Sequence, residues 1–271
     1  MRVFDLGDGD PAVAIVGAVH GDEPCGARAV ERLRASLPDP IAPVRLIVAN
    51  ERALAVDKRY IDEDLNRVFP GRGSADTHEG ALAARLREAV VGCTVLSLHA
   101  TQSTDRPFAL VDQITDPLRA LLAALPLEAV VETAPFSSGR LIDNSPVIEL
   151  ECGLQHSLHA AENAYWLSMA FLVASGVLET SPTMPSEISD RLASRGPQTP
   201  VFSLTGEIAK PEAAQYEVLV ENFHAVDDGE TYARADTHAL TADGVFYPVL
   251  MSAAGYRDIL GYTARRIGDL S

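Results

Sequence analysis

Cysteine is scarce in this chain, and its few cysteines lie far apart. The 271 residues include Cys25, Cys93 and Cys152, and none of them belongs to a C-x-x-C pair. An odd and sparse count argues against a disulfide framework. The opening segment, residues 1–11, has aspartates where a signal peptide would have its apolar core. We therefore expect a protein of the reducing cytoplasm.

Apolar runs long enough to cross a bilayer are also missing. The longest apolar stretch, residues 166–178, contains Ser168, Ser175 and Gly176, whereas a transmembrane helix needs about 20 mostly apolar residues. Positive charge is in short supply as well, because 22 basic and 38 acidic residues leave a net charge of −16. A field of that sign repels nucleic acid and anionic membranes. The sequence thus predicts no membrane segment, and neither nucleic acid nor a membrane as partner.

Lysine is nearly absent from the sequence. Lys58 and Lys210 are the only two lysines, so the other 20 of the 22 basic residues are arginines. An acid surplus spread along the chain, combined with little lysine, resembles the proteins of salt-loving archaea. A GC-rich genome also replaces lysine by arginine, so a halophilic protein is one expectation and genomic bias is the alternative.

Despite these shortages, the chain has the composition of a globular protein. Hydrophobic residues make up 47% of it, which is enough for a sizeable core. Between residues 12 and 152, β-branched runs alternate with amphipathic helical patterns, and a long helical pattern follows over about 155–178. This alternation predicts an α/β fold with a mostly parallel or mixed central sheet flanked by helices.

The pattern changes after residue 180. Prolines and small polar residues fill the segment 181–199, which predicts a connection. From residue 200 onward, short apolar runs alternate with turn residues, as is typical of a small antiparallel β unit. We therefore predict an α/β domain over 1–180, which carries all but one of the candidate site residues, and a small β-rich C-terminal domain over 200–271.

The sharpest local feature is a histidine and a glutamate at the end of the first buried strand. His20 and Glu23 lie three residues apart, directly before a helix that begins with Pro24. Imidazole nitrogens and carboxylate oxygens are ordinary zinc ligands, and a catalytic zinc site takes three protein ligands. His99 is the natural third ligand, because it ends another predicted strand and open α/β sheets collect ligands at that edge. The alternative is a turn histidine next to an acid that the helix dipole favours.

A second cluster lies in residues 58–71, which have no clean helical or strand period. Arg59, Asn66 and Arg67 occur there among three acids. Guanidinium forks bind carboxylates with two parallel hydrogen bonds, and an asparagine amide adds a neutral donor. The alternative is a solvated loop in which the arginines pair with the neighbouring acids.

A third cluster places acids in an apolar strand. Alternation over residues 147–152 sets Glu149 and Glu151 on the same face. Burying acids is costly unless they are paired or functional. Glu151, at the carboxyl end of the strand, is placed to act as a base beside a metal, whereas Glu149 either faces solvent or pairs with an arginine.

Four short motifs occur in one order: HGDE at 20–23, DLNR at 64–67, LHAT at 98–101 and LECG at 150–153. With this order, the chain resembles the succinylglutamate desuccinylase/aspartoacylase family, which is related to the zinc carboxypeptidases. The tail over 245–260 also resembles the final strand and tyrosine-rich turn of that family.

The resemblance implies a set of functional residues. They are the zinc ligands His20, Glu23 and His99, the catalytic residues Glu151 and Arg59, and the substrate-binding residues Asn66, Arg67, Arg140 and Tyr256. Glu151 would be the general base, and Arg59 would polarise the scissile carbonyl. Asn66 and Arg67 would hold the α-carboxylate of the substrate, and Arg140 would hold a second carboxylate. One zinc ion per chain is implied.

Three positions depart from the family pattern. Ser97 stands two residues before His99, where an acid is common, so the group that orients this histidine is in question. Ser252 also stands where an acid is often found. The turn itself reads Ala-Ala-Gly-Tyr over 253–256, so the substrate contact of its tyrosine is an expectation that this substitution weakens.

The function implied by the resemblance is a zinc-dependent amidohydrolase that releases an amino acid from a small N-acyl amino acid. Two alternatives stay open: a zinc carboxypeptidase that acts on a small peptide, and a non-catalytic homologue that binds a carboxylate ligand. Glu151 argues against the second alternative, because a pure binding protein has no use for a base beside the metal. A homo-oligomer also stays open.

Overall fold

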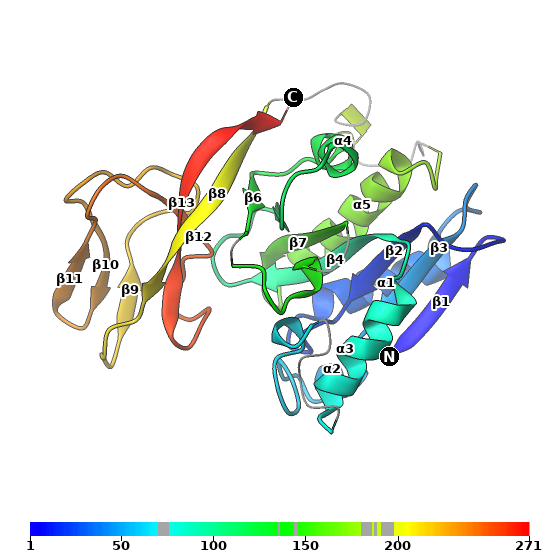
Figure 1. Ribbon diagram of the computed structural model, residues 1–271, viewed down its shortest axis with the longest axis horizontal. Coiled ribbons are helices and arrows are strands. Elements are labelled where there is room, and N and C mark those ends of the chain that lie inside the picture. The colour runs from blue at the N-terminus through cyan, green and yellow to red at the C-terminus, as the bar shows by residue number, and fades with distance from the viewer. Residues whose placement is uncertain are drawn as a thin grey trace.

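The computed structural model describes residues 1–69, 76–134, 136–143, 146–179, 186, 189–190 and 198–270. Its strands are β1 (Arg2–Leu6), β2 (Val13–Gly17), β3 (Val44–Val48), β4 (Thr94–Thr101), β5 (Phe108–Val111), β6 (Val130–Glu132), β7 (Val147–Leu154), β8 (Thr199–Ala209), β9 (Tyr216–Val218), β10 (Thr231–Ala235), β11 (His238–Thr241), β12 (Tyr247–Val249) and β13 (Ile259–Leu270). Its helices are α1 (Pro24–Ser36), α2 (Glu51–Ala55), α3 (His78–Ala89), α4 (Asp116–Ala124) and α5 (Leu158–Ala174), with short 3-10 turns at Leu65–Arg67 and Leu141–Asp143. Figure 1 shows their arrangement.

The central sheet has ten strands and is mixed. Its strand order is β1-β3-β2-β4-β7-β5-β6-β8-β13-β12. The neighbours β3, β2, β4 and β7 run parallel, whereas β5 runs antiparallel to β7. The short segment 102–107 that joins β4 to β5 cannot form a crossover, which needs about a dozen residues, so the chain reverses there. The predicted mixed sheet flanked by helices is confirmed.

Helices cover both faces of this sheet. On one face α1, α4 and α5 pack against the strands and bury Leu33, Leu122 and Phe171. On the other face α3 buries Leu82 and Leu86. Because both faces are covered, β2 is apolar along its whole length and every one of its residues is buried.

Two glycines allow α1 to begin very close to the sheet. A Cβ atom on Gly17 would lie 2.3 Å from the carbonyl carbon of Gly26, so no side chain fits at this contact. Pro24 occupies the first turn of α1, where a missing backbone N–H costs nothing. This tight junction places residues 20–23 at the carboxyl end of β2.

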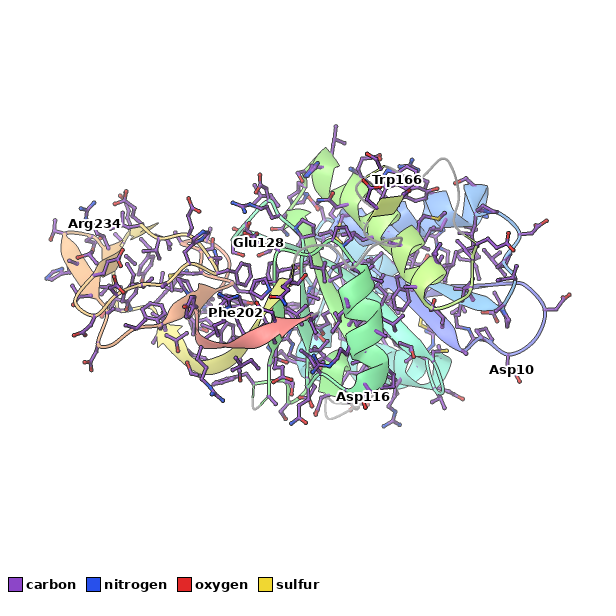
Figure 2. All side chains as sticks on the ribbon, turned by 90° about the horizontal axis from the view of Figure 1, so that it is seen from above. Asp10, Asp116, Glu128, Trp166, Phe202 and Arg234 are labelled. Atoms are coloured by element: carbon purple, nitrogen blue, oxygen red, sulfur yellow. The ribbon has the colours of Figure 1, made fainter. Side chains whose placement is uncertain are left out.

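A second sheet lies at one end of the molecule. Strands β9, β10 and β11 form a three-stranded antiparallel sheet, and Figure 2 shows it, with Arg234, at the far end from Trp166 and Asp10. The flanking strands β8 and β13 pair with each other, and β8 also pairs with β6 in the large sheet. The C-terminal segment thus contributes to both sheets, and the domain limits at residues 180 and 200 stay a prediction. Most of the predicted connection over 181–199 lies outside the described residues.

Among the strands and α-helices before residue 180, two have no counterpart among the sequence predictions. The edge strand β1 pairs antiparallel with β3 and is largely exposed, so its apolar pattern is weak. The helix α2 has only five residues. None of the helices in the described part of the chain is both long and apolar enough to cross a membrane.

Candidate active site

Two histidines and a glutamate meet at the carboxyl ends of β2 and β4. His20 Nδ1 lies 2.8 Å from Glu23 Oε1, and His99 Nδ1 lies 3.1 Å from Glu23 Oε2. One ligand atom from each of the three residues lies within 4.8 Å of the others, and all three side chains are buried. The structure therefore brings together the three residues that the sequence predicts as metal ligands.

Each histidine of this cluster is oriented by a second partner. His20 Nε2 lies 3.1 Å from Asp64 Oδ1, and His99 Nε2 lies 3.0 Å from Ser97 Oγ. Both rings thus turn Nδ1 toward the centre and Nε2 toward an orienting group, as metal-binding histidines do. Ser97 contacts the ring directly, which answers the question raised by its departure from the family pattern. Two oriented imidazoles and a carboxylate fit a metal ion such as zinc.

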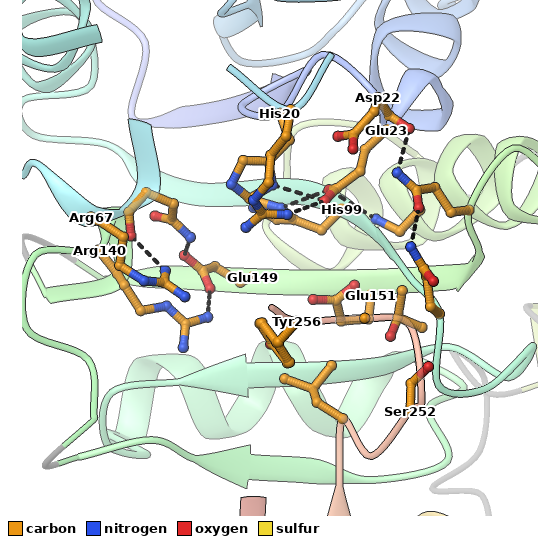
Figure 3. Close-up of a pocket in the computed structure, with 18 residues that line it drawn as sticks. His20, Asp22, Glu23, Arg67, His99, Arg140, Glu149, Glu151, Ser252 and Tyr256 are labelled. Carbon is orange, nitrogen blue, oxygen red and sulfur yellow. Dashed lines mark hydrogen bonds and ion pairs between the residues drawn. The ribbon is translucent and has the colours of Figure 1, made fainter. Parts of the chain in front are cut away.

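Glu151 lies on β7 beside this cluster. Its backbone is paired with that of His99, and its side chain lines the same pocket, as Figure 3 shows. Its Oε2 atom is buried and has no hydrogen-bond partner among the residues that the structure describes. Burial raises the pKa of Glu151 to about 7; His99 opposes this shift, and the carboxylates of Glu23 and Glu149 add to it. A carboxyl group with a pKa near neutrality is suited to accept and return a proton.

Arg59 lines the pocket beside the histidine cluster. Its Nε donates to Asp64 Oδ2 at 2.9 Å, and its second contact is to Glu23 Oε1 at 3.3 Å. Although burial opposes the charged form, these two carboxylates hold the pKa of Arg59 above its ordinary value. The guanidinium has further N–H groups beyond these two contacts, and the side chain lines the pocket.

The acids of the loop before α3 hold this loop in place. Asp62 accepts a hydrogen bond from the backbone N–H of His78 at the start of α3, at 2.8 Å. Asp64 accepts one from the backbone N–H of Asn66, also at 2.8 Å, and it pairs with Arg59. The sequence left open a solvated loop in which arginines pair with neighbouring acids, and the pair between Arg59 and Asp64 is indeed present. The acids also accept hydrogen bonds from backbone N–H groups of neighbouring turns, so the loop has a fixed shape.

Glu79 is a buried residue of this region that sequence reasoning missed. Its Oε1 accepts from the backbone N–H of Ile61 at 2.8 Å and from Asn50 Nδ2 at 2.9 Å, and its Oε2 accepts from the backbone N–H groups of Asp62 and Glu63 at 3.0 and 3.3 Å. Burial opposes the charge, but these bonds outweigh it and lower the pKa of Glu79. The partners lie 16 to 29 residues away, and a glutamate in the first turn of a helix is ordinary in sequence, so no local signal indicated this role.

We expect Glu79→Gln to loosen the loop that carries Arg59 and Arg67. The new amide group has to face backbone donors, which leaves buried N–H groups without acceptors at a cost of about 2 kcal/mol in the free energy of unfolding. Urea unfolding measures this loss, and kcat/KM is expected to fall by about tenfold. Since the Glu79 pKa is lowered, its contribution to stability is present at neutral pH and is lost as the pH falls below the unfolded value toward the folded one.

Glu88→Gln is the matched control for this prediction, because Glu88 is exposed on the same helix. It is expected to leave both stability and kcat/KM unchanged. Equal behaviour of the two variants would contradict a positioning role for Glu79.

The predicted carboxylate-binding residues lie together on one side of the pocket. Asn66 Nδ2 donates to Glu149 Oε1 at 2.9 Å, and Asn66 Oδ1 accepts from the backbone N–H of Leu141 at 2.8 Å. Arg140 forms an ion pair with Glu149. Arg67 donates to the backbone oxygen of Asn66 at 2.8 Å. Of the two alternatives for Glu149, pairing with an arginine is the one found, and the residue is only 1% exposed.

The turn that carries Tyr256 lines the pocket opposite the metal cluster (Figure 3). The ring of Tyr256 meets that of Tyr262 edge to face, with 6.1 Å between the ring centroids. Lys210 fixes the turn, because its Nζ donates to the backbone oxygens of Ala253 at 2.8 Å and of Tyr256 at 2.5 Å. One of the two lysines of the chain thus holds a wall of the pocket.

Replacement of Lys210 by methionine is expected to weaken substrate binding. The variant keeps the length of the side chain but leaves two turn carbonyls without their donor, so Tyr256 loses its fixed position. We expect KM to rise several-fold, roughly the effect of about 1 kcal/mol of lost positioning, with a smaller change in kcat. The other lysine, Lys58, is exposed, and Lys58→Met serves as the control. A KM that is equal in the two variants would contradict this role.

Structures of known proteins share the fold of this chain. A succinylglutamate desuccinylase/aspartoacylase from Rhodobacter sphaeroides is 19% identical, with a TM-score of 0.73 and coverage of 98% of this chain and 89% of that one. The product-bound ectoine utilization protein EutE (DoeB) from Ruegeria pomeroyi is 17% identical, with a TM-score of 0.72 and coverage of 99% and 88%. Murine aminoacylase 3 is 20% identical, with a TM-score of 0.70 and coverage of 97% of both chains.

No curated protein sequence matches the chain. The family model described as the succinylglutamate desuccinylase/aspartoacylase catalytic domain matches residues 9–165, which is more than half of the chain. These residues include β2, β4 and β7, whose carboxyl ends carry the histidine cluster and Glu151. The chain therefore belongs to the succinylglutamate desuccinylase/aspartoacylase family, whose members are acyl-amino-acid deacylases.

Proposed function

We propose that this protein is a zinc-dependent amidohydrolase that cleaves the amide bond of an N-acyl amino acid. One observation supports this most strongly. The Glu151 carboxylate, with a buried oxygen that has no partner in the described part of the chain, lines the same pocket as the His20, Glu23 and His99 cluster. A base beside three clustered metal-ligand groups is the arrangement that hydrolysis by an activated water requires.

His20, Glu23 and His99 would hold one zinc ion. Zinc bound there would act as a Lewis acid that lowers the pKa of a water and polarises the scissile carbonyl. The orienting contacts of Asp64 and Ser97 keep both imidazole rings turned toward the centre of the cluster. Loss of either contact would weaken metal binding.

The protein residues divide the remaining chemistry among them. Glu151 takes a proton from the attacking water and passes it to the leaving nitrogen, so the amino acid departs as an amine. The N–H groups of Arg59 that do not contact Asp64 or Glu23 donate to the carbonyl oxygen as negative charge develops on it. Arg67 offers its guanidinium to the carboxylate of the amino acid.

The test is amine release from a panel of N-acetyl, N-succinyl and longer N-acyl amino acids, with and without a chelator. The assay is run in dilute buffer and in molar KCl, because a halophilic protein is one of the two explanations for the acidic, lysine-poor composition. Turnover that a chelator abolishes and zinc restores is the expected result. Small peptides form a second arm, and faster cleavage of a C-terminal residue from them would favour the carboxypeptidase alternative. Folded, zinc-loaded protein that turns over no member of either arm would contradict the proposal and favour a binding role.

A further inference from the structure

Three guanidinium groups line the pocket, and they differ in their partners. Arg59 and Arg140 form ion pairs with acids of the protein. Arg67 instead donates to the backbone oxygen of Asn66, and no ion pair joins it to any acid that the structure describes. The charge of Arg67 is therefore available to one carboxylate of a substrate.

The acid that neutralises Arg140 is built into the pocket wall. Glu149 and Arg140 line the pocket and are 1% and 7% exposed. Figure 3 shows the two side chains together, with Glu151 lying between them and Ser252. Burial disfavours a charged Glu149, but Arg140 and the amide of Asn66 outweigh it and keep the pKa of Glu149 below its ordinary value. Glu149 thus stays negative at neutral pH.

A second substrate carboxylate has no favourable place beside this pair. A carboxylate that approached Arg140 would also approach Glu149, whose charge is buried and cannot move into solvent. Two negative charges that come close together repel each other strongly where water is excluded. An amide, a hydroxyl or an alkyl group meets a neutral ion pair there and avoids this repulsion.

We propose that the enzyme selects N-acyl amino acids with a single carboxylate, which Arg67 binds, and that Glu149 excludes a second carboxylate from the Arg140 side of the pocket. This inference rests on the proposed hydrolase function. The family resemblance implied that Arg140 binds a second carboxylate of the substrate. Under this inference Arg140 pairs with Glu149 instead, and the charge of Glu149 repels substrates that carry a second carboxylate.

The test uses substrate pairs of equal size that differ in charge. N-acetylaspartate is compared with N-acetylasparagine, and N-succinylalanine with N-succinamoylalanine. We expect the wild-type enzyme to favour the neutral member in kcat/KM by about tenfold or more in at least one of the two pairs. Glu149→Gln is expected to reduce that preference by about tenfold in the pair whose variable group reaches Arg140. Because both members of a pair use the same catalytic groups, their ratio cancels any effect of the variant on Glu151.

Controls separate discrimination from a general structural effect. Glu207→Gln alters an exposed strand residue and is expected to leave both ratios unchanged. If Glu149→Gln does not fold, the double variant Glu149→Gln/Arg140→Gln removes both charges and is expected to lower the preference for the neutral member. A wild-type preference for the acidic member of either pair would overturn the inference, and so would a Glu149→Gln variant in which the ratios of both pairs stay within about twofold of wild type.

Binding provides a second readout that does not depend on turnover. Calorimetry with the chelator-treated protein compares the affinities for the acidic and the neutral member of each pair. If no substrate is turned over, the hydrolase proposal fails, but tighter binding of the neutral members would still support the role of Glu149. Tighter binding of an acidic member would contradict that role whatever the outcome of the activity assay.

Discussion

Glu151→Gln is expected to lower kcat by roughly 10²- to 10⁴-fold while the protein stays folded and keeps its zinc. The substitution preserves the shape of the side chain but removes the group that accepts a proton from water and returns it to the leaving nitrogen. Since Glu151 makes no hydrogen bond through its buried Oε2 to any residue that the structure describes, the folded state loses little. Stopped-time amine release measures kcat, and metal analysis measures bound zinc.

The exposed Glu88 offers a matched control for this substitution, because Glu88→Gln removes a similar charge from a residue that does not line the pocket. We expect it to have the kcat of the wild type. A Glu151→Gln variant that kept more than about a tenth of wild-type kcat would assign the proton transfer to another group.

His99→Ala is expected to abolish both zinc binding and turnover. The imidazole is one of three clustered ligand groups, and its loss leaves Glu23 with one histidine partner instead of two. With two ligand groups, the site no longer has the three protein donors that a catalytic zinc takes. Bound zinc is expected to fall from about one ion per chain to nearly none, as measured by atomic spectroscopy after dialysis.

His159→Ala is the control for this experiment. His159 lies on α5 and is exposed, so its removal should change neither bound zinc nor kcat. Retention of a full equivalent of zinc by the His99 variant would mean that the metal is held elsewhere.

The order of strands and helices could be predicted from the sequence because it follows from local patterns. Alternating β-branched runs and amphipathic segments mark the strands from β2 to β7 and, apart from α2, the helices between them. Which strands pair with each other depends on residues far apart in the sequence, so it could not be predicted from local patterns. A strand pattern does not say which neighbour it pairs with, so the sequence did not indicate that β8 and β13 extend the large sheet.

The convergence of His20, Glu23, His99 and Glu151 could be anticipated, because all four lie at or near the carboxyl ends of predicted strands, where open α/β sheets collect their ligands. Their roles stay predictions until the variants are measured. The contacts of Glu79 could not be anticipated in the same way. They depend on how loops cross between elements, and residue types alone do not encode which buried acid meets which backbone donor.

The same limit applies to Glu149. Alternation placed it on the face of Glu151, but its contact with Asn66 spans 83 residues of sequence. Because of that contact and the ion pair with Arg140, Glu149 is a buried, charged residue of the pocket wall. The proposed specificity thus depends on packing between distant segments more than on the motifs themselves.

The most direct test of the central claim is a zinc titration of the chelator-treated enzyme, with the rate of amine release measured on the best N-acyl amino acid of the panel. The protein offers one cluster of three ligand groups in the part of the chain that the structure describes. We therefore predict a rate that rises linearly and levels off at about one equivalent of zinc per chain. Full activity in the zinc-free protein, or a rate that does not respond to zinc, would contradict the account.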